Sequence, residues 1–214
     1  MVQHSRPKAL DLYCGAGGAA MGLERAGYSV TGVDILPQKN YPFAFSFGNA
    51  LDADLSGYDL VWASPPCQNH SRMSGCREGL RDKYLSLIAA TREKLKAWGG
   101  PWIIENVVGA PLENPVMLCG AMFSLKTYRH RIFESNVSLT VPHHPKHDKK
   151  SSKAGHWKNG TLVSVAGNCA PIALAREAME IDWTTCAELA EAVPPAFSEY
   201  LARQTLRVTA RLNY

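Results

Sequence analysis

The sequence predicts a doubly wound α/β fold, in which a mostly parallel β-sheet is covered by helices on both faces and carries a small basic insertion. Three observations favour this fold. Short apolar segments typical of buried strands alternate with segments of helical periodicity. A glycine-rich turn at residues 15–18 follows the first apolar segment. Polar side chains stand where apolar segments end, as at Asp34 and Glu105.

The first half of the chain shows this alternation most clearly. Residues 8–13 are predicted to form a buried parallel strand that ends in the glycine turn. Residues 19–26 are predicted to form a helix closed by Gly27, because glycine is the preferred residue just after a helix. Residues 29–34 are expected to form the second strand, and residues 58–63 another.

The elements that follow repeat the same pattern. Residues 81–98 have helical periodicity, with apolar side chains on related faces, and the run Gly99-Gly100-Pro101 ends that helix. Residues 102–104 are then predicted to form a strand that leads into Glu105. Three further helices are expected at residues 176–181, 186–192 and 196–206.

Length and composition fit one main domain with its own core. The 214 residues, 46% hydrophobic and 20% charged, are ordinary for a globular protein. No apolar stretch is long enough to span a bilayer, and residues 1–8 lack the apolar segment of a signal peptide. Six cysteines without a Cys-x-x-Cys pair favour free thiols in a reducing compartment, so we expect a cytoplasmic protein.

A candidate ligand site is predicted at one edge of the sheet. Ligands of doubly wound sheets bind at the carboxyl ends of the strands. Tyr13, Asp34, Cys67 and Glu105 all stand at such ends, so we expect them to line one cleft. The two prolines before Cys67 stiffen its turn and can present the thiol at this cleft, although cysteines in general are more often small buried side chains.

Four sequence blocks stand in an order that points to one family. They are Asp-Leu-Tyr-Cys-Gly-Ala-Gly-Gly at 11–18, Ala-Ser-Pro-Pro-Cys-Gln at 63–68, Ile-Ile-Glu-Asn-Val at 103–107 and Arg-His-Arg at 129–131. The glycine turn alone would also suit a nicotinamide cofactor, but hydride transfer has no use for a Pro-Pro-Cys turn. With all four blocks in this order, the chain resembles the carbon-5 cytosine-specific DNA methyltransferases. The resemblance implies a Rossmann-like class I methyltransferase fold.

Covalent catalysis is the chemistry that this resemblance implies. Carbon-5 of cytosine is too weak a nucleophile to attack a methyl donor unaided, and a thiolate that adds to carbon-6 makes it reactive. By resemblance, Cys67 is the nucleophile, Glu105 stabilises the charge that develops at ring nitrogen-3, and Arg131 and Arg129 orient the glutamate. A simple salt bridge for Glu105 and surface charge for the arginines are the alternatives. The target cytosine has to flip out of a duplex, because a thiol cannot reach carbon-6 within the stack.

The resemblance also implies S-adenosylmethionine as the cofactor. The glycine turn and Tyr13 would hold its methionine end, and Asp34 would accept hydrogen bonds from both ribose hydroxyls. Asn49 stands where the family usually has an aspartate at the adenine edge, and Pro66 would line the path of the methyl group. The complete set assigned to the cofactor is Tyr13, Gly15, Ala16, Gly17, Gly18, Asp34, Ile35, Asn49, Pro66 and Val193.

Composition changes after residue 141. Residues 142–159 hold four histidines, five lysines and a single acid, so we expect a basic, weakly structured insertion. The chain divides into a catalytic cofactor-binding domain (1–140), a small target-recognition insertion (141–172) and C-terminal helices that return to the catalytic domain (173–214). Because the family's recognition domain is much larger, we expect DNA as the partner with a short or relaxed target sequence.

The histidines of the insertion raise the question of a metal site. His143, His144, His147 and His156 are candidate zinc ligands, but their spacing matches no standard structural site and no cysteine is near them in the sequence. We therefore predict no metal, and a solvated basic loop that contacts phosphate.

Other functions remain open at this stage. The same chemistry could act on RNA, a free cytidine nucleotide or single-stranded DNA, for which a small recognition segment would suffice. A catalytically silent nucleic-acid-binding homologue is a third candidate, and the intact Cys67, Glu105 and Arg131 count against it.

Overall fold

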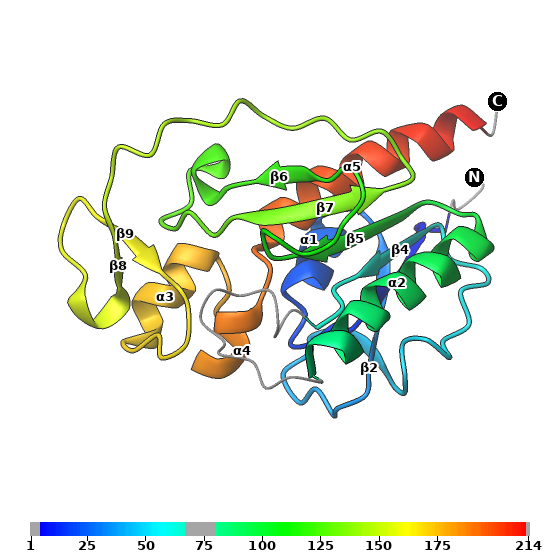
Figure 1. The fold of residues 1–214 in the computed structure, drawn as a ribbon, viewed down its shortest axis with the longest axis horizontal. Helices are drawn as coiled ribbons and strands as arrows, with labels where there is room; N and C mark the ends of the chain where they lie inside the picture. Colours follow the sequence, from blue (N-terminus) through cyan, green and yellow to red (C-terminus); the bar gives the residue numbers. More distant parts are fainter. Residues whose placement is uncertain (1–4, 67–79, 213–214) are drawn as a thin grey trace.

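The computed structural model describes residues 5–66 and 80–212, and its centre is a seven-stranded sheet in the order β3-β2-β1-β4-β5-β7-β6 (Figure 1). The strands are β1 (Lys8–Leu12), β2 (Ser29–Asp34), β3 (Ala44–Phe47), β4 (Leu60–Ala63), β5 (Trp102–Asn106), β6 (Val116–Leu118) and β7 (Arg131–Ser135). Strand β7 runs antiparallel to β5 and β6, and the pairings among β1 to β5 are parallel. The predicted doubly wound, mostly parallel sheet is confirmed.

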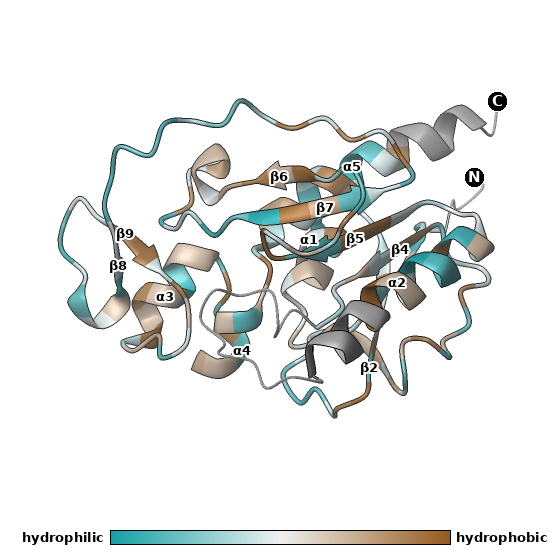
Figure 2. Cartoon of the chain, in the orientation of Figure 1, coloured by the Kyte–Doolittle hydropathy of each residue, from teal (hydrophilic) through white to brown (hydrophobic). Residues whose placement is uncertain are grey.

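Two hydrophobic layers cover the sheet because alternate residues of each strand point to opposite faces. On one face, α1 (Gly18–Ala26) and α5 (Pro195–Leu212) share a core with side chains such as Trp62 and Phe133. On the other face, α2 (Leu80–Trp98) packs with Val61 and Ile104. Figure 2 shows the hydrophobic colouring of β5 and β7 at the centre of these layers.

Helices α1 and α5 approach each other closely at Gly22. A Cβ atom at this position would lie 2.1 Å from the carbonyl oxygen of Pro195 and 2.1 Å from the hydroxyl of Ser198. Glycine is therefore required there for the two helices to pack as they do. This contact holds the C-terminal helix against the helix that follows the glycine turn.

A buried ion pair attaches α2 to β7. The Arg92 guanidinium donates from Nε to Oε1 of Glu134 at 2.7 Å and from Nη2 to Oε2 at 2.8 Å, and the two side chains are 9% and 4% exposed. The paired geometry compensates the cost of burying both charges.

A smaller unit follows the sheet, with its own core. The parallel strands β8 (Ser151–Lys153) and β9 (Leu162–Ser164) pair with each other, and the 3₁₀ helix η2 spans Ala154–His156. Helices α3 (Ile172–Met179) and α4 (Cys186–Glu191) share a hydrophobic cluster with residues of this insertion. Helices α3 and α4 lie after the expected boundary at residue 172 but share the hydrophobic core of the insertion. Helix α5 packs on the catalytic domain.

The segment between β7 and β8 is largely hydrophilic and contains no helix or strand from residue 136 to 150 (Figure 2). The cysteines that the structure describes, at positions 14, 119, 169 and 186, are free thiols. No helix within residues 5–66 and 80–212 is long and apolar enough to cross a membrane.

Candidate active site

The glycine turn after β1 takes a backbone path that side chains rarely allow. Tyr13, Gly15 and Gly17 have φ angles of 57°, 48° and 84°. A Cβ atom at Gly17 would also lie 2.8 Å from the ring of Pro42. Among residues 5–66 and 80–212, no atom lies within 4 Å of a Cβ atom placed at Gly15, so the described part of the chain leaves the backbone there open. This open backbone is where a ligand can approach closely.

Residues distant in the sequence enclose this turn. The indole of Trp183 donates to the carbonyl oxygen of Ala16 at 2.7 Å. The carbonyl oxygen of Val193 would lie 2.5 Å from a Cβ atom at Gly18, so Val193 packs directly against the start of α1. The structure thus brings together Ala16, Gly18 and Val193, three residues of the predicted cofactor set. The role of Trp183 was not predicted.

Asp34, at the end of β2, is held in place by a hydrogen bond from the glycine turn. One of its carboxylate oxygens accepts a hydrogen bond from the Gly15 amide at 3.0 Å, and the other accepts one from the Leu36 amide at 2.9 Å. Each oxygen keeps a further acceptor site for a ligand hydroxyl.

Exposed apolar residues follow Asp34 in the chain and pair with it in the sheet. Ile35 and Leu36 are each 64% exposed and Phe47, which is paired with Asp34 in the sheet register, is 66% exposed. Large apolar groups left open beside an acceptor suit a ligand with both a flat ring and hydroxyl groups. Ile35 thereby joins the predicted site, and Phe47 is an addition that its sequence did not reveal.

Asn49 lies in the exposed turn after β3. Its side-chain amide donates to Asp52 at 3.0 Å, and its carbonyl oxygen accepts from the Leu51 amide at 3.1 Å. The side chain therefore shapes its own turn, and its contact with the adenine edge stays a prediction.

Asp11 in β1 is a fully buried carboxylate that the sequence analysis did not single out. Neither of its oxygens has a hydrogen bond of acceptable geometry in the described part of the chain, although the Tyr41 hydroxyl lies close. Burial raises the pKa of Asp11 well above its usual value, and the nearby charges of Asp34 and Glu105 act in the same direction. Asp11 is 0% exposed, so it belongs to the interior of the protein.

Glu105 lies on β5 and is 6% exposed. Its Oε1 atom is 2.9 Å from Nε of Arg131, the first residue of β7. The two side chains are diagonal neighbours on one face, because Glu105 is paired with Phe133 in the antiparallel register. Burial raises the pKa of Glu105, and the positive charges of Arg131 and Arg129 oppose this increase. The predicted pairing of Glu105 with Arg131 is present in the structure.

The Pro65-Pro66 turn is attached to the strand that carries Glu105. The side-chain amide of Asn106 donates to the carbonyl oxygen of Pro65 at 3.0 Å. The Ser64 hydroxyl lies in hydrogen-bonding contact with Glu105 and accepts from the Trp62 indole at 3.0 Å. The Pro65-Pro66 turn and the Glu105 carboxylate therefore lie at the same edge of the sheet. Cys67 lies outside the described residues.

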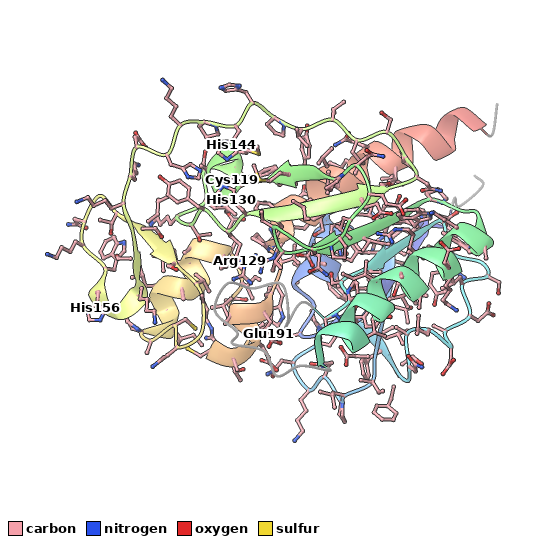
Figure 3. The ribbon with its side chains drawn as sticks, viewed as in Figure 1. Cys119, Arg129, His130, His144, His156 and Glu191 are labelled. Atoms are coloured by element: carbon pink, nitrogen blue, oxygen red, sulfur yellow. The ribbon has the colours of Figure 1, made fainter. Side chains whose placement is uncertain are left out.

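Arg129 contacts the smaller unit. Its guanidinium donates to the carbonyl oxygens of Val165 at 2.6 Å, and of Ala190 and Ala192 at 2.7 Å each. Figure 3 shows Arg129 on the side of α4, near the labelled Glu191. Arg129 thus connects the end of β9 and the end of α4 to the catalytic domain, while its charge still acts on Glu105.

The comparisons with known proteins agree with this geometry. A model of the family "C-5 cytosine-specific DNA methylase" matches residues 8–112, which include the glycine turn, the Pro-Pro-Cys turn and Glu105. No curated protein matches the chain.

Three solved structures share the fold. A prophage-encoded protein of E. coli, described as a DNA modification methyltransferase, has a TM-score of 0.65 at 14% identity and covers 97% of this chain and 100% of its own. The methyltransferase EhMeth of Entamoeba histolytica has a TM-score of 0.63 at 11% identity, with 96% and 99% covered. The Dnmt2 methyltransferase of S. pombe has a TM-score of 0.56 at 13% identity, with 98% and 100% covered.

At these identities the solved structures support the fold alone, whereas the family model covers three of the four sequence blocks, all except residues 129–131. Those motifs lie on the strands and turns that hold Asp34, Glu105 and the Pro65-Pro66 turn in the structure. Residues 8–112 therefore carry the C-5 cytosine-specific DNA methylase domain, and S-adenosylmethionine is its methyl donor.

Proposed function

We propose that this protein methylates carbon-5 of cytosine in DNA through a covalent adduct on Cys67. One observation carries the proposal. Glu105 is buried beside Arg131, and the next residue, Asn106, holds the carbonyl oxygen of Pro65. A base that enters this edge of the sheet would meet the carboxylate and the turn that leads to residue 67 together.

The cofactor end of the site is formed by the glycine turn and β2. Asp34 would bind the ribose hydroxyls, with Ile35 and Phe47 beside the adenine ring. Bound S-adenosylmethionine supplies an electrophilic methyl group. Pro66 and Asn49 remain in the proposed set, next to the methyl path and the adenine edge respectively.

The base end of the site handles charge and protons. Addition of the Cys67 thiolate to carbon-6 moves electrons toward carbon-5 and toward nitrogen-3. Burial keeps the pKa of Glu105 raised, which favours a shared or bound proton at the carboxyl group facing nitrogen-3. Arg131 fixes the orientation of that group. After carbon-5 accepts the methyl group, loss of its proton and departure of the thiolate restore the cytosine ring.

The smaller unit is proposed to contact DNA. The lysines at positions 149, 150 and 153 are exposed, and the part of the insertion that precedes α3 is short. Exposed lysines bind phosphates irrespective of sequence, and few side chains remain to contact base edges. A duplex with a short or relaxed target sequence is therefore the proposed substrate.

A methyl-transfer assay tests the proposal and its alternatives together. Labelled S-adenosylmethionine would be incubated with duplex DNA, tRNA or dCMP, with Cys67→Ser as the inactive control and Cys76→Ser as the matched control from the same segment. We expect 5-methylcytosine in duplex DNA with the wild type and with Cys76→Ser. Transfer to tRNA or dCMP alone would contradict DNA as the substrate. DNA binding without transfer to any substrate would favour a catalytically silent homologue.

A further inference from the structure

One cysteine and three histidines from distant parts of the chain meet beside the edge of the sheet. Cys119 follows β6, His130 precedes β7, and His144 and His147 belong to the segment between β7 and β8. The Sγ atom and one ring nitrogen of each histidine all lie within 4.8 Å of one another. Figure 3 shows Cys119, His130 and His144 together, with His156 far from them.

Two of the distances between these atoms match those of a tetrahedral zinc site, and all four atoms lie within 4.8 Å of one another. Zinc bonds of about 2.3 Å to sulfur and about 2.0–2.1 Å to nitrogen place neighbouring ligands about 3.5 Å apart for sulfur and nitrogen, and about 3.3 Å apart for two nitrogens. In the structure, Sγ of Cys119 lies 3.4 Å from Nε2 of His147. Nε2 of His130 lies 3.2 Å from Nε2 of His144. We propose that Cys119, His130, His144 and His147 bind one Zn²⁺ ion.

The chemistry of the donors supports zinc. The group offers one sulfur and three imidazole nitrogens and no carboxylate, whereas Ca²⁺ and Mg²⁺ require oxygen ligands. Zinc binds a cysteine as the thiolate, which the bound cation itself stabilises.

Zinc would fix the middle of the segment between β7 and β8, because the segment's other hydrogen bonds lie near its ends. Residues 136–150 form neither helix nor strand. Thr140 forms hydrogen bonds with the side chain of Gln204, and the Tyr128 hydroxyl donates a hydrogen bond to the backbone carbonyl oxygen of Lys149. His144 and His147 lie between these points, and the Tyr128 ring stacks on His147 with ring centroids 3.7 Å apart. Four protein ligands leave no open position, so the ion is structural and fastens the basic segment to β6 and β7.

This proposal reverses the prediction of no metal. That prediction used the spacing of histidines within residues 142–159, where no cysteine occurs. Cys119 comes 25 positions before His144, and the β6–β7 hairpin, which pairs Leu118 with Arg131, places it beside His130. His143 and His156 are exposed and do not belong to the group, so they serve as controls.

The test is metal binding by the full chain. The wild type would be stripped with a chelator, loaded with Zn²⁺, desalted and analysed for metal content. Binding of Co²⁺ would be followed separately through its visible d–d bands and its thiolate-to-cobalt charge-transfer band. We expect one zinc ion per chain for the wild type and for His143→Ala. His144→Ala should weaken zinc binding by more than about 100-fold, because even groups that only support a ligand contribute 10- to 100-fold.

Cys119→Ser separates the metal site from simple packing. This variant should lose the charge-transfer band, since that band requires a cobalt–sulfur bond. If His144→Ala fails to fold, the spectra of the wild type and Cys119→Ser still decide the question. Failure of the wild type to retain zinc would overturn the proposal. Equal losses in His143→Ala and His144→Ala, or an unchanged thiolate band in Cys119→Ser, would overturn it as well.

Discussion

Replacing Arg131 with methionine would leave the Glu105 carboxylate buried without its ion-pair partner. The two side chains are 12% and 8% exposed, so water can do little to screen the remaining charge. Breaking a buried pair in this way costs about 3–5 kcal/mol in the free energy of unfolding. For a chain of this size, that loss corresponds to a decrease on the order of 10 °C in the midpoint of thermal unfolding at neutral pH.

The pH dependence of this loss identifies its cause. Burial raises the pKa of Glu105 above its usual value, and removal of Arg131 raises it further. At pH values below the pKa of Glu105 in the unfolded chain, this residue is protonated in both the wild type and Arg131→Met, so the penalty is absent there. The penalty develops as pH rises through the raised pKa of the folded state, because the folded protein must then bury a charge. Arg131→Met should therefore differ least from the wild type near pH 4.5 and most near pH 8.

Thermal and urea unfolding of both proteins across this pH range would measure the effect. The double variant Glu105→Gln/Arg131→Met is the control, because it removes the buried charge and should recover part of the lost stability. A loss of equal size at both ends of the range would refute the reasoning, since a missing packing contact rather than an uncompensated charge would then account for it.

Three further predictions concern the cofactor, the helix contact and the nucleic acid. Asp34→Ala should raise KM for S-adenosylmethionine with little change in kcat, because the ribose contacts exist in both ground and transition states; unchanged cofactor affinity in a titration would contradict this role. Gly22→Ala should lower the free energy of unfolding by about 1–3 kcal/mol in urea, because the added methyl group meets the backbone of α5; an unchanged midpoint would show that the helices separate without cost. Alanine at Lys149, Lys150 and Lys153 should weaken binding equally for all duplex sequences and reduce the log–log salt slope by about 0.9 per lost contact; an unchanged slope would exclude phosphate contacts by these lysines.

The central strands could be predicted from the sequence because they are short apolar runs bounded by turn residues. The expected bounds of β2 and α1 agree with the structure to within one residue. Strand β3 was missed because Ala44–Phe47 is mostly exposed and forms by pairing with β2 rather than by burial. Strand β6 has three residues, too few for a recognisable pattern. Helix α3 begins four residues before the expected start, at Ile172.

The site was predictable where a motif carries it, and not where it depends on contacts between distant segments. Glu105 and Arg131 were expected from the resemblance, and they form an ion pair. The hydrogen bond from Asn106 to Pro65 depends on the register between β4 and β5, which cannot be read from the sequence. Asp11 did have a signal, because a charged residue in the middle of an apolar strand must be buried.

Covalent trapping tests the central claim most directly. A duplex whose target cytosine carries fluorine at carbon-5 cannot lose that atom, so the adduct with the nucleophile persists once the methyl group has been transferred. With S-adenosylmethionine present, we predict a stable protein–DNA adduct that mass spectrometry assigns to Cys67. Cys67→Ala should form no adduct and still bind the cofactor. An adduct on Cys76, or its persistence in Cys67→Ala, would contradict the account.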